Sequence, residues 1–146
     1  MRNFIVAAAL VLGAAPLCVG SVALAQERTS APAGAEVYFI SPKDGAIVHN
    51  PVRVQFGLKG MGVAPAGVKY DNTGHHHLLI DTEPPSDQST PLPATDKIVH
   101  FGKGQTETTL NLAPGKHTLQ LVLADANHIP HSPPVISKKI TITVEP

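Results

Sequence analysis

Cysteine is almost absent from this sequence, and its single cysteine, Cys18, lies in a short apolar run near the start of the chain. Residues 1–25 have the layout of a secretory signal peptide, with a basic residue before the apolar run and Ala23 and Ala25 spaced for cleavage. We therefore expect a mature chain that begins at Gln26 and contains no thiol. Disulfides and thiol chemistry are excluded for it, although export leads to a compartment where disulfides form.

Charge of either sign is also scarce. Lys, Arg, Asp and Glu make up 15% of the sequence, and outside the signal peptide ten basic residues face eleven acidic ones. This balance provides no basic surface for nucleic acid. No apolar run after residue 25 reaches the ~20 residues that a spanning helix needs. We expect a periplasmic or secreted protein without a nucleic-acid partner and without a membrane segment after cleavage.

Tryptophan is absent, whereas 14 prolines and 12 glycines interrupt the chain and disfavour helices. Short runs in which apolar and polar residues alternate, such as 52–58, are typical of half-buried strands. About seven such runs follow a flexible leader at residues 26–34; they cover 36–40, 52–58, 75–81, 98–101, 106–112, 117–124 and 135–144. The sequence predicts one all-β domain over residues 35–146, an immunoglobulin-like antiparallel β-sandwich. A small barrel is the alternative.

Two long segments lack a strand pattern, Thr82–Lys97 with four prolines and Asp125–Pro134 with three. Loops of this length in a small domain are usually functional or mobile. They support one interpretation of the protein, a periplasmic interaction or structural module that uses the Pro-rich loops and an exposed sheet edge.

Signatures of catalysis are missing as well. The sequence has no Gly-x-Ser-x-Gly elbow, and the segment Gly102-Lys103-Gly104 is not followed by the helix that a phosphate loop requires. We expect a binding protein rather than an enzyme, with no catalytic residues and no organic cofactor.

Histidine is the abundant residue, with eight copies, three of them consecutive. On a strand, His75 and His77 share one face about 7 Å apart, a spacing from which two imidazoles reach one metal ion. His76 faces the core, where we expect a hydrogen-bonded structural role. In the run 117–124, His117 lies on the same strand face as the leucines that we expect to be buried. We expect its ring to hydrogen-bond back across the turn that precedes this strand.

A second pair of histidines, His128 and His131, follows the strand that ends at Ala124. In an immunoglobulin-like sandwich this strand pairs antiparallel with the strand that begins at His75, so the two pairs of histidines converge at one rim. The sequence predicts a site for one divalent transition metal ion. Its ligands are His75, His77, His128 and His131, with His76 and His100 as secondary candidates.

Imidazole ligands suit Cu(II), Zn(II) and Ni(II), and the sulfur ligands that Cu(I) prefers are lacking. The expected metal is therefore copper(II) or zinc, with copper slightly favoured by the periplasmic setting. Solvent-exposed histidines without a common ligand are the alternative interpretation.

Four segments carry a family resemblance: 73–81 (TGHHHLLID), 100–107 (HFGKGQTE), 112–121 (LAPGKHTLQL) and 124–131 (ADxxHxPH). They resemble the bacterial domain of unknown function 4399 (DUF4399) family over roughly residues 35–144. The resemblance implies a secreted or periplasmic β-domain, and it assigns no activity.

The turn at 41–46, Ser-Pro-x-x-Gly-Ala, also resembles the opening of periplasmic copper-resistance β-sandwiches. Those proteins use a histidine at the mature N-terminus. This chain is expected to begin at Gln26, so that ligand has no counterpart here.

Overall fold

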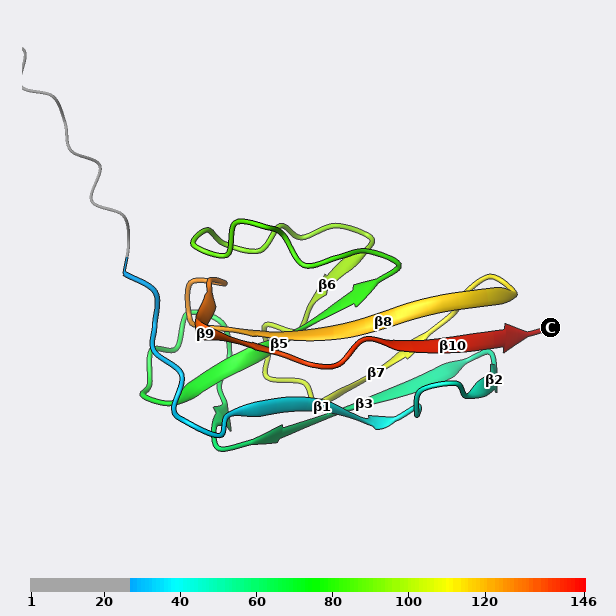
Figure 1. Ribbon diagram of the computed structural model, residues 1–146, viewed down its shortest axis with the longest axis horizontal. Coiled ribbons are helices and arrows are strands. Elements are labelled where there is room, and N and C mark those ends of the chain that lie inside the picture. Colours follow the sequence, from blue (N-terminus) through cyan, green and yellow to red (C-terminus); the bar gives the residue numbers. More distant parts are fainter. Residues whose placement is uncertain (1–26) are drawn as a thin grey trace, which may run out of the picture.

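The computed structural model describes residues 27–146, which form two packed β-sheets (Figure 1). The predicted signal peptide and its cleavage site lie outside the described residues. Within residues 27–146 no helix is long and apolar enough to cross a membrane. The ten strands are β1 (Glu36–Ser41), β2 (Ile47–His49), β3 (Val52–Lys59), β4 (Gly62–Val63), β5 (Thr73–Ile80), β6 (Ile98–His100), β7 (Glu107–Leu110), β8 (Gly115–Ala124), β9 (Pro130–Ile136) and β10 (Ile140–Glu145).

The smaller sheet has the order β1-β3-β7, and the larger one has the order β2-β10-β8-β5-β4, with β6 on β5 and β9 on β8. The two sheets lie face to face, as Figure 1 shows. The predicted all-β sandwich is therefore confirmed. The strand count was too low, and the two short pairs β2–β10 and β4–β5 are parallel rather than antiparallel.

The main core lies between the two sheets. Alternation on β3 turns Val54 and Phe56 inward, and β8 contributes Leu119, Leu121 and Leu123 from the opposite sheet. All five side chains are at most 3% exposed. This alternation is the pattern that identified both strands in the sequence.

Strand β5 is buried on both faces, with residues 74–79 all inaccessible to solvent. Its inner face packs Leu78 into the main core, whereas Leu79 on the outer face belongs to a second, smaller apolar cluster. That cluster also contains Leu92, from the Pro-rich loop 82–97. In Figure 1 this loop lies on the side of the seven-stranded sheet that faces away from the three-stranded sheet. The loop therefore covers the outer face of the sheet.

Two segments differ from the sequence-based expectation. The run 135–144 is divided into β9 and β10, because Ser137 turns its hydroxyl to the Leu121 N–H at 2.9 Å and interrupts the ladder on β8. The predicted flexible leader is partly ordered: Ser30 pairs with Ser132 of β9, and Ala31 is 8% exposed within the main core. Apolar burial of Ala31 and backbone pairing on β9 hold this part of the leader in place.

His117 closes the corner that leads into β8, as predicted. Its Nε2 donates to the Ala113 carbonyl at 2.8 Å, and its Nδ1 donates to the Asp81 carboxylate at 2.7 Å. The hydrogen bond with Asp81 raises the pKa of His117. Burial raises the pKa of Asp81, but hydrogen bonds from His117 and from the Thr118 N–H outweigh it and lower that pKa. Below the raised pKa of His117 the pair is therefore a charged imidazolium on a carboxylate.

Replacing His117 with Ala should lower the free energy of unfolding by about 1–2 kcal/mol in mildly acidic solution, because it removes this charge-assisted pair. The contribution of His117 is complete below its ordinary pKa of 6.5 and is lost as the pH rises through the raised folded value. The contribution of Asp81 is lost as the pH falls through its lowered folded value. Urea unfolding should thus show a large difference from wild type near pH 6 and a smaller one near pH 9.

The control is Lys116→Ala, an exposed neighbour on the same strand. It should leave stability within about 0.5 kcal/mol at both pH values. A His117→Ala deficit that does not change with pH would contradict a charged pair.

Candidate metal centre

Four histidines from three elements meet above the outer face of the seven-stranded sheet. His75 and His77 come from β5, His100 ends β6, and His128 lies in the turn between β8 and β9. Pairing of β5 with β8 places His75 opposite Ala124, which brings the turn that follows Ala124 next to His75. This confirms the predicted antiparallel pairing that brings the two segments together. Pairing of β5 with β6 places His100 opposite His77, and residues opposite each other project to the same face.

The four imidazole rings are in mutual contact. The distances between ring centroids are 4.7 Å for His100–His128, 4.8 Å for His75–His77, 5.0 Å for His75–His100, 5.0 Å for His75–His128, 5.1 Å for His77–His100 and 6.1 Å for His77–His128. One ring nitrogen from each of His75, His100 and His128 lies within 4.8 Å of the others. We call these four side chains the histidine cluster.

Burial differs within the histidine cluster. His75 and His77 are 0% and 1% exposed, His128 is half-buried and His100 is exposed. Both ring nitrogens of His75 and the Nδ1 of His77 are buried without a hydrogen-bond partner among the described residues. A buried polar atom without a partner costs about 1–3 kcal/mol, so each such atom needs an explanation, and a bound ion is one.

Burial also fixes the protonation state of the two inner rings. Burial, together with the neighbouring His100 and His128, lowers the pKa of His75 to about 4. Burial and the adjacent His75 lower the pKa of His77 to about 3. The pKa of His100 is lowered for the same reasons, burial first and His128 second. These rings are neutral at physiological pH, which is the state in which imidazole binds a metal ion.

The turn that carries His128 is organised by the buried carboxylate of Asp125. Its Oδ1 accepts hydrogen bonds from the N–H groups of Asn127 at 2.8 Å and Ile129 at 3.1 Å, and its Oδ2 accepts from the Thr29 hydroxyl at 2.6 Å. Within this turn the backbone of His128 has a φ of 66°. The left-handed conformation is uncommon for a residue with a side chain, and the Asp125 bonds hold the backbone in it.

Two surrounding loops are attached to the elements of the histidine cluster. Residues 64–67 join the segment after His100 to the turn that carries His128. The Ala66 N–H donates to the Gly102 carbonyl and the Gly67 N–H donates to the Ala126 carbonyl, both at 2.9 Å. The Pro-rich loop is attached to the same turn, because the Leu92 N–H donates to the His128 carbonyl at 2.8 Å. The cluster is therefore held by hydrogen bonds beyond the strands themselves.

His131 is not part of the histidine cluster, although its spacing from His128 suggested it. Its ring lies against Gly74, where an added Cβ would be 2.9 Å from the imidazole, on the inner face of β5 beside Leu123. Its nitrogens are 3.4 Å from the Leu123 carbonyl and 3.2 Å from the Thr73 carbonyl. β9 begins at Pro130, so His131 already follows the alternation of a strand and faces the other side of the sheet.

His76 faces the core as predicted, but not with the expected hydrogen bonds. Its ring lies 5.1 Å from that of Phe56, and neither ring nitrogen has a partner in the described part of the chain. It packs as an apolar ring. His100, a secondary candidate from the sequence, is the residue that joins the histidine cluster, and its position follows from the pairing of β6 with β5.

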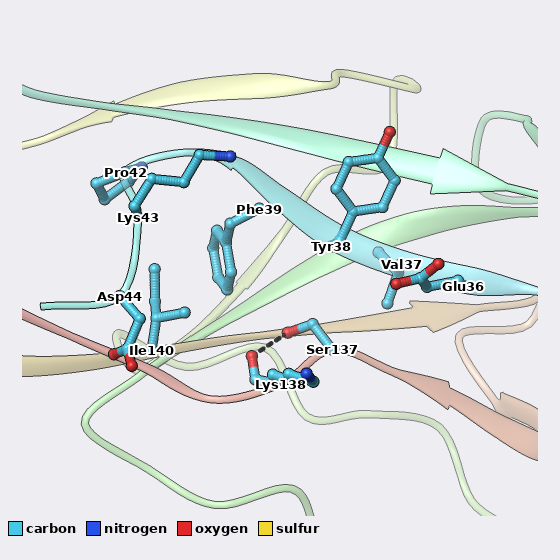
Figure 2. A pocket seen from close by; sticks show the side chains of 10 residues that line it. All are labelled: Glu36, Val37, Tyr38, Phe39, Pro42, Lys43, Asp44, Ser137, Lys138 and Ile140. Carbon is cyan, nitrogen blue, oxygen red and sulfur yellow. Dashed lines mark hydrogen bonds between the residues drawn. The ribbon is translucent and has the colours of Figure 1, made fainter.

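Two hollows elsewhere on the surface lack comparable chemistry. Figure 2 shows one of about 210 Å³ between β1 and the link from β9 to β10, in which the Ser137 hydroxyl donates to the Lys138 carbonyl. The other, of about 610 Å³, lies between Glu27–Ser30 and the loop 67–73. Neither is lined by any of the unpartnered buried atoms found among residues 27–146. The histidine cluster is therefore the strongest candidate site.

Fold and site together define a small all-β sandwich with a buried histidine cluster on the outer face of its larger sheet. The family model "Domain of unknown function (DUF4399)" matches residues 54–145, and the chain belongs to this family. All four cluster histidines and Asp125 lie within the matched segment.

The chain is similar to part of a solved structure, the endo-beta-1,4-mannanase from Thermotoga petrophila, with 19% identity and a TM-score of 0.45. The match covers 76% of this chain and 20% of the mannanase chain, so this chain spans about a fifth of that enzyme. No curated protein matches the chain. The resemblance to copper-resistance sandwiches stays a prediction, because none of these comparisons bears on it.

Replacing Asp125 with Ala should lower the free energy of unfolding by about 2–3 kcal/mol, since it leaves the buried Ile129 N–H, the partly buried Asn127 N–H and the Thr29 hydroxyl without their acceptor. Urea unfolding measures this loss. The matched control is Asn127→Ala in the same turn, whose side chain is exposed and should contribute less than about 0.5 kcal/mol. Equal effects of the two substitutions would show that the carboxylate does not organise the turn.

Proposed function

We propose that this protein is an exported binding protein that holds one divalent transition metal ion, copper(II) or zinc, through the histidine cluster. The observation that carries the proposal is the pair of buried rings, His75 and His77, with unpartnered nitrogens beside the rings of His100 and His128. A metal ion supplies the electron-pair acceptor that these nitrogens lack inside the protein.

The proposal is for binding rather than catalysis. The histidine cluster is made of imidazoles alone, which is a ligand set for a metal ion. Its neutral rings are prepared to donate lone pairs, and the hydrogen-bonded turn and loops around them reduce the conformational cost of assembling ligands.

The alternative function, a periplasmic interaction or structural module without metal, relies on the Pro-rich loops and an exposed sheet edge; one of those loops is 82–97. In the structure this loop folds back on its own sheet: Leu92 is 8% exposed, and its N–H is bonded to the His128 carbonyl. The apolar residue that a partner would bind is thus used within the fold. This observation favours the metal-binding proposal over the alternative.

Thermal unfolding tests the proposal. After treatment with a chelator, adding Zn(II) or Cu(II) at about one hundred times the dissociation constant should stabilise the wild-type protein by about 2.7 kcal/mol, which raises Tm by roughly 10 °C for a domain of this size. The variant His75→Ala/His77→Ala should lose most of this shift, because both inner ligands are gone.

Two further variants keep the test interpretable. His100→Ala changes an exposed side chain, folds without creating a cavity, and should also reduce the shift. His49→Ala removes an exposed histidine of β2, outside the histidine cluster, and should retain the full shift. The proposal fails if no divalent transition metal raises Tm, or if the double variant responds as strongly as wild type.

A further inference from the structure

We infer that the histidine cluster closes around its metal as a tetrahedral shell of four imidazoles, the coordination of a zinc-type site, with no position left for water. This inference rests on the proposed function, and it adds the coordination geometry, the class of metal and the way in which the metal leaves. It departs from the slight preference for copper that the sequence suggested.

The expected geometry follows from bond lengths. A metal–nitrogen bond of about 2.05 Å places the centroid of an imidazole ring about 3.2 Å from the metal. Tetrahedral coordination then separates all six pairs of centroids by about 5.2 Å. A square plane, which Cu(II) favours, gives four separations of about 4.5 Å and two diagonal separations of about 6.4 Å.

The observed distances fit the tetrahedron better. Five of the six separations fall between 4.7 and 5.1 Å, and only His77–His128 is longer, at 6.1 Å. If His77 and His128 formed one diagonal of a square plane, His75 and His100 would have to form the other. Those two rings are 5.0 Å apart. A tetrahedral shell requires that the rings of His77 and His128 approach each other by about 1 Å, and that a nitrogen of His77 joins those of His75, His100 and His128.

His77 decides between a closed and an open site. The nitrogens of His75, His100 and His128 are close enough to hold a metal without it, and a three-histidine site with a bound water is the arrangement of catalytic zinc. The ring of His77, however, lies 4.8 Å from His75 and 5.1 Å from His100, and its buried Nδ1 has no partner among the described residues. No nitrogen of His77 belongs to the group within 4.8 Å, so its ring fills the fourth position by moving toward the other three. A metal held by four protein ligands is stored or transferred rather than used to activate water.

His100 is the ligand through which the metal enters and leaves, and Gly102 positions it. His100 is exposed, whereas the other three rings are buried or half-buried. A Cβ added to Gly102 would be 2.2 Å from Cε1 and 2.6 Å from Nε2 of His100, so the ring lies directly against this glycine. An alanine there displaces the ring and opens the shell without removing a ligand from the sequence.

Cobalt(II) absorption tests the inference on the folded chain. Tetrahedral Co(II) has intense visible bands, whereas five- and six-coordinate Co(II) absorbs far more weakly. One equivalent of Co(II) should give the intense bands in wild type, and Zn(II) should abolish them by displacement. In wild type the bands should not change between about pH 6 and pH 9, because no water is bound to the metal. In His77→Ala and Gly102→Ala water completes the shell, and the bands should shift with pH as that water ionises near about pH 7, while circular dichroism shows an unchanged fold.

The matched control is Gly62→Ala, because an added Cβ there meets only Thr73 Cγ2 at 3.4 Å. It should keep the wild-type spectrum. Weak bands in wild type, or wild-type bands that shift with pH as strongly as those of His77→Ala, would overturn the closed tetrahedral shell while leaving metal binding intact. Absence of any Co(II) or Zn(II) binding would instead contradict the proposed function itself.

Discussion

The burial of two neutral imidazoles on a strand that is covered on both faces is the constraint on which the site depends. His75 and His77 alternate with residues that fill the main core, so neither ring can turn inward. Both ring nitrogens of His75 and the Nδ1 of His77 have no hydrogen-bond partner within the described fold. Such atoms cost stability unless something binds them, and the rings of His100 and His128 surround the place where a ligand would do so.

Hydrogen bonds outside the strands hold in place the segments that carry the histidine cluster. Asp125 fixes the backbone of the turn that carries His128, and residues 64–67 join that turn to the segment after His100. The Pro-rich loop adds a cover anchored by Leu92. The loop makes few backbone hydrogen bonds to the sheet, so the missing N–H of proline costs little there. Proline also lowers the entropy that the loop loses on ordering.

Most of the fold could be predicted from the sequence, because alternation of apolar residues marks the faces of β3 and β8, and the pairing of β5 with β8 follows from the sandwich topology. The choice of the fourth ligand could not. His128 and His131 are three residues apart in a segment that reads as a loop, but the left-handed backbone of His128 and the start of β9 at Pro130 send His131 to the opposite face. The available signal for His100 was the period of two that puts Ile98 and His100 on one face of β6. The pairing of β6 with β5 is a long-range contact that no local pattern reveals.

X-ray absorption at the zinc edge tests the central claim most directly, because it counts the atoms bound to the metal in the folded protein. For the chain loaded with one equivalent of Zn(II), the account predicts four nitrogen donors at about 2.0–2.1 Å, with the outer-shell scattering of imidazole rings. A shell dominated by oxygen donors, or a chain that retains no zinc, would contradict it.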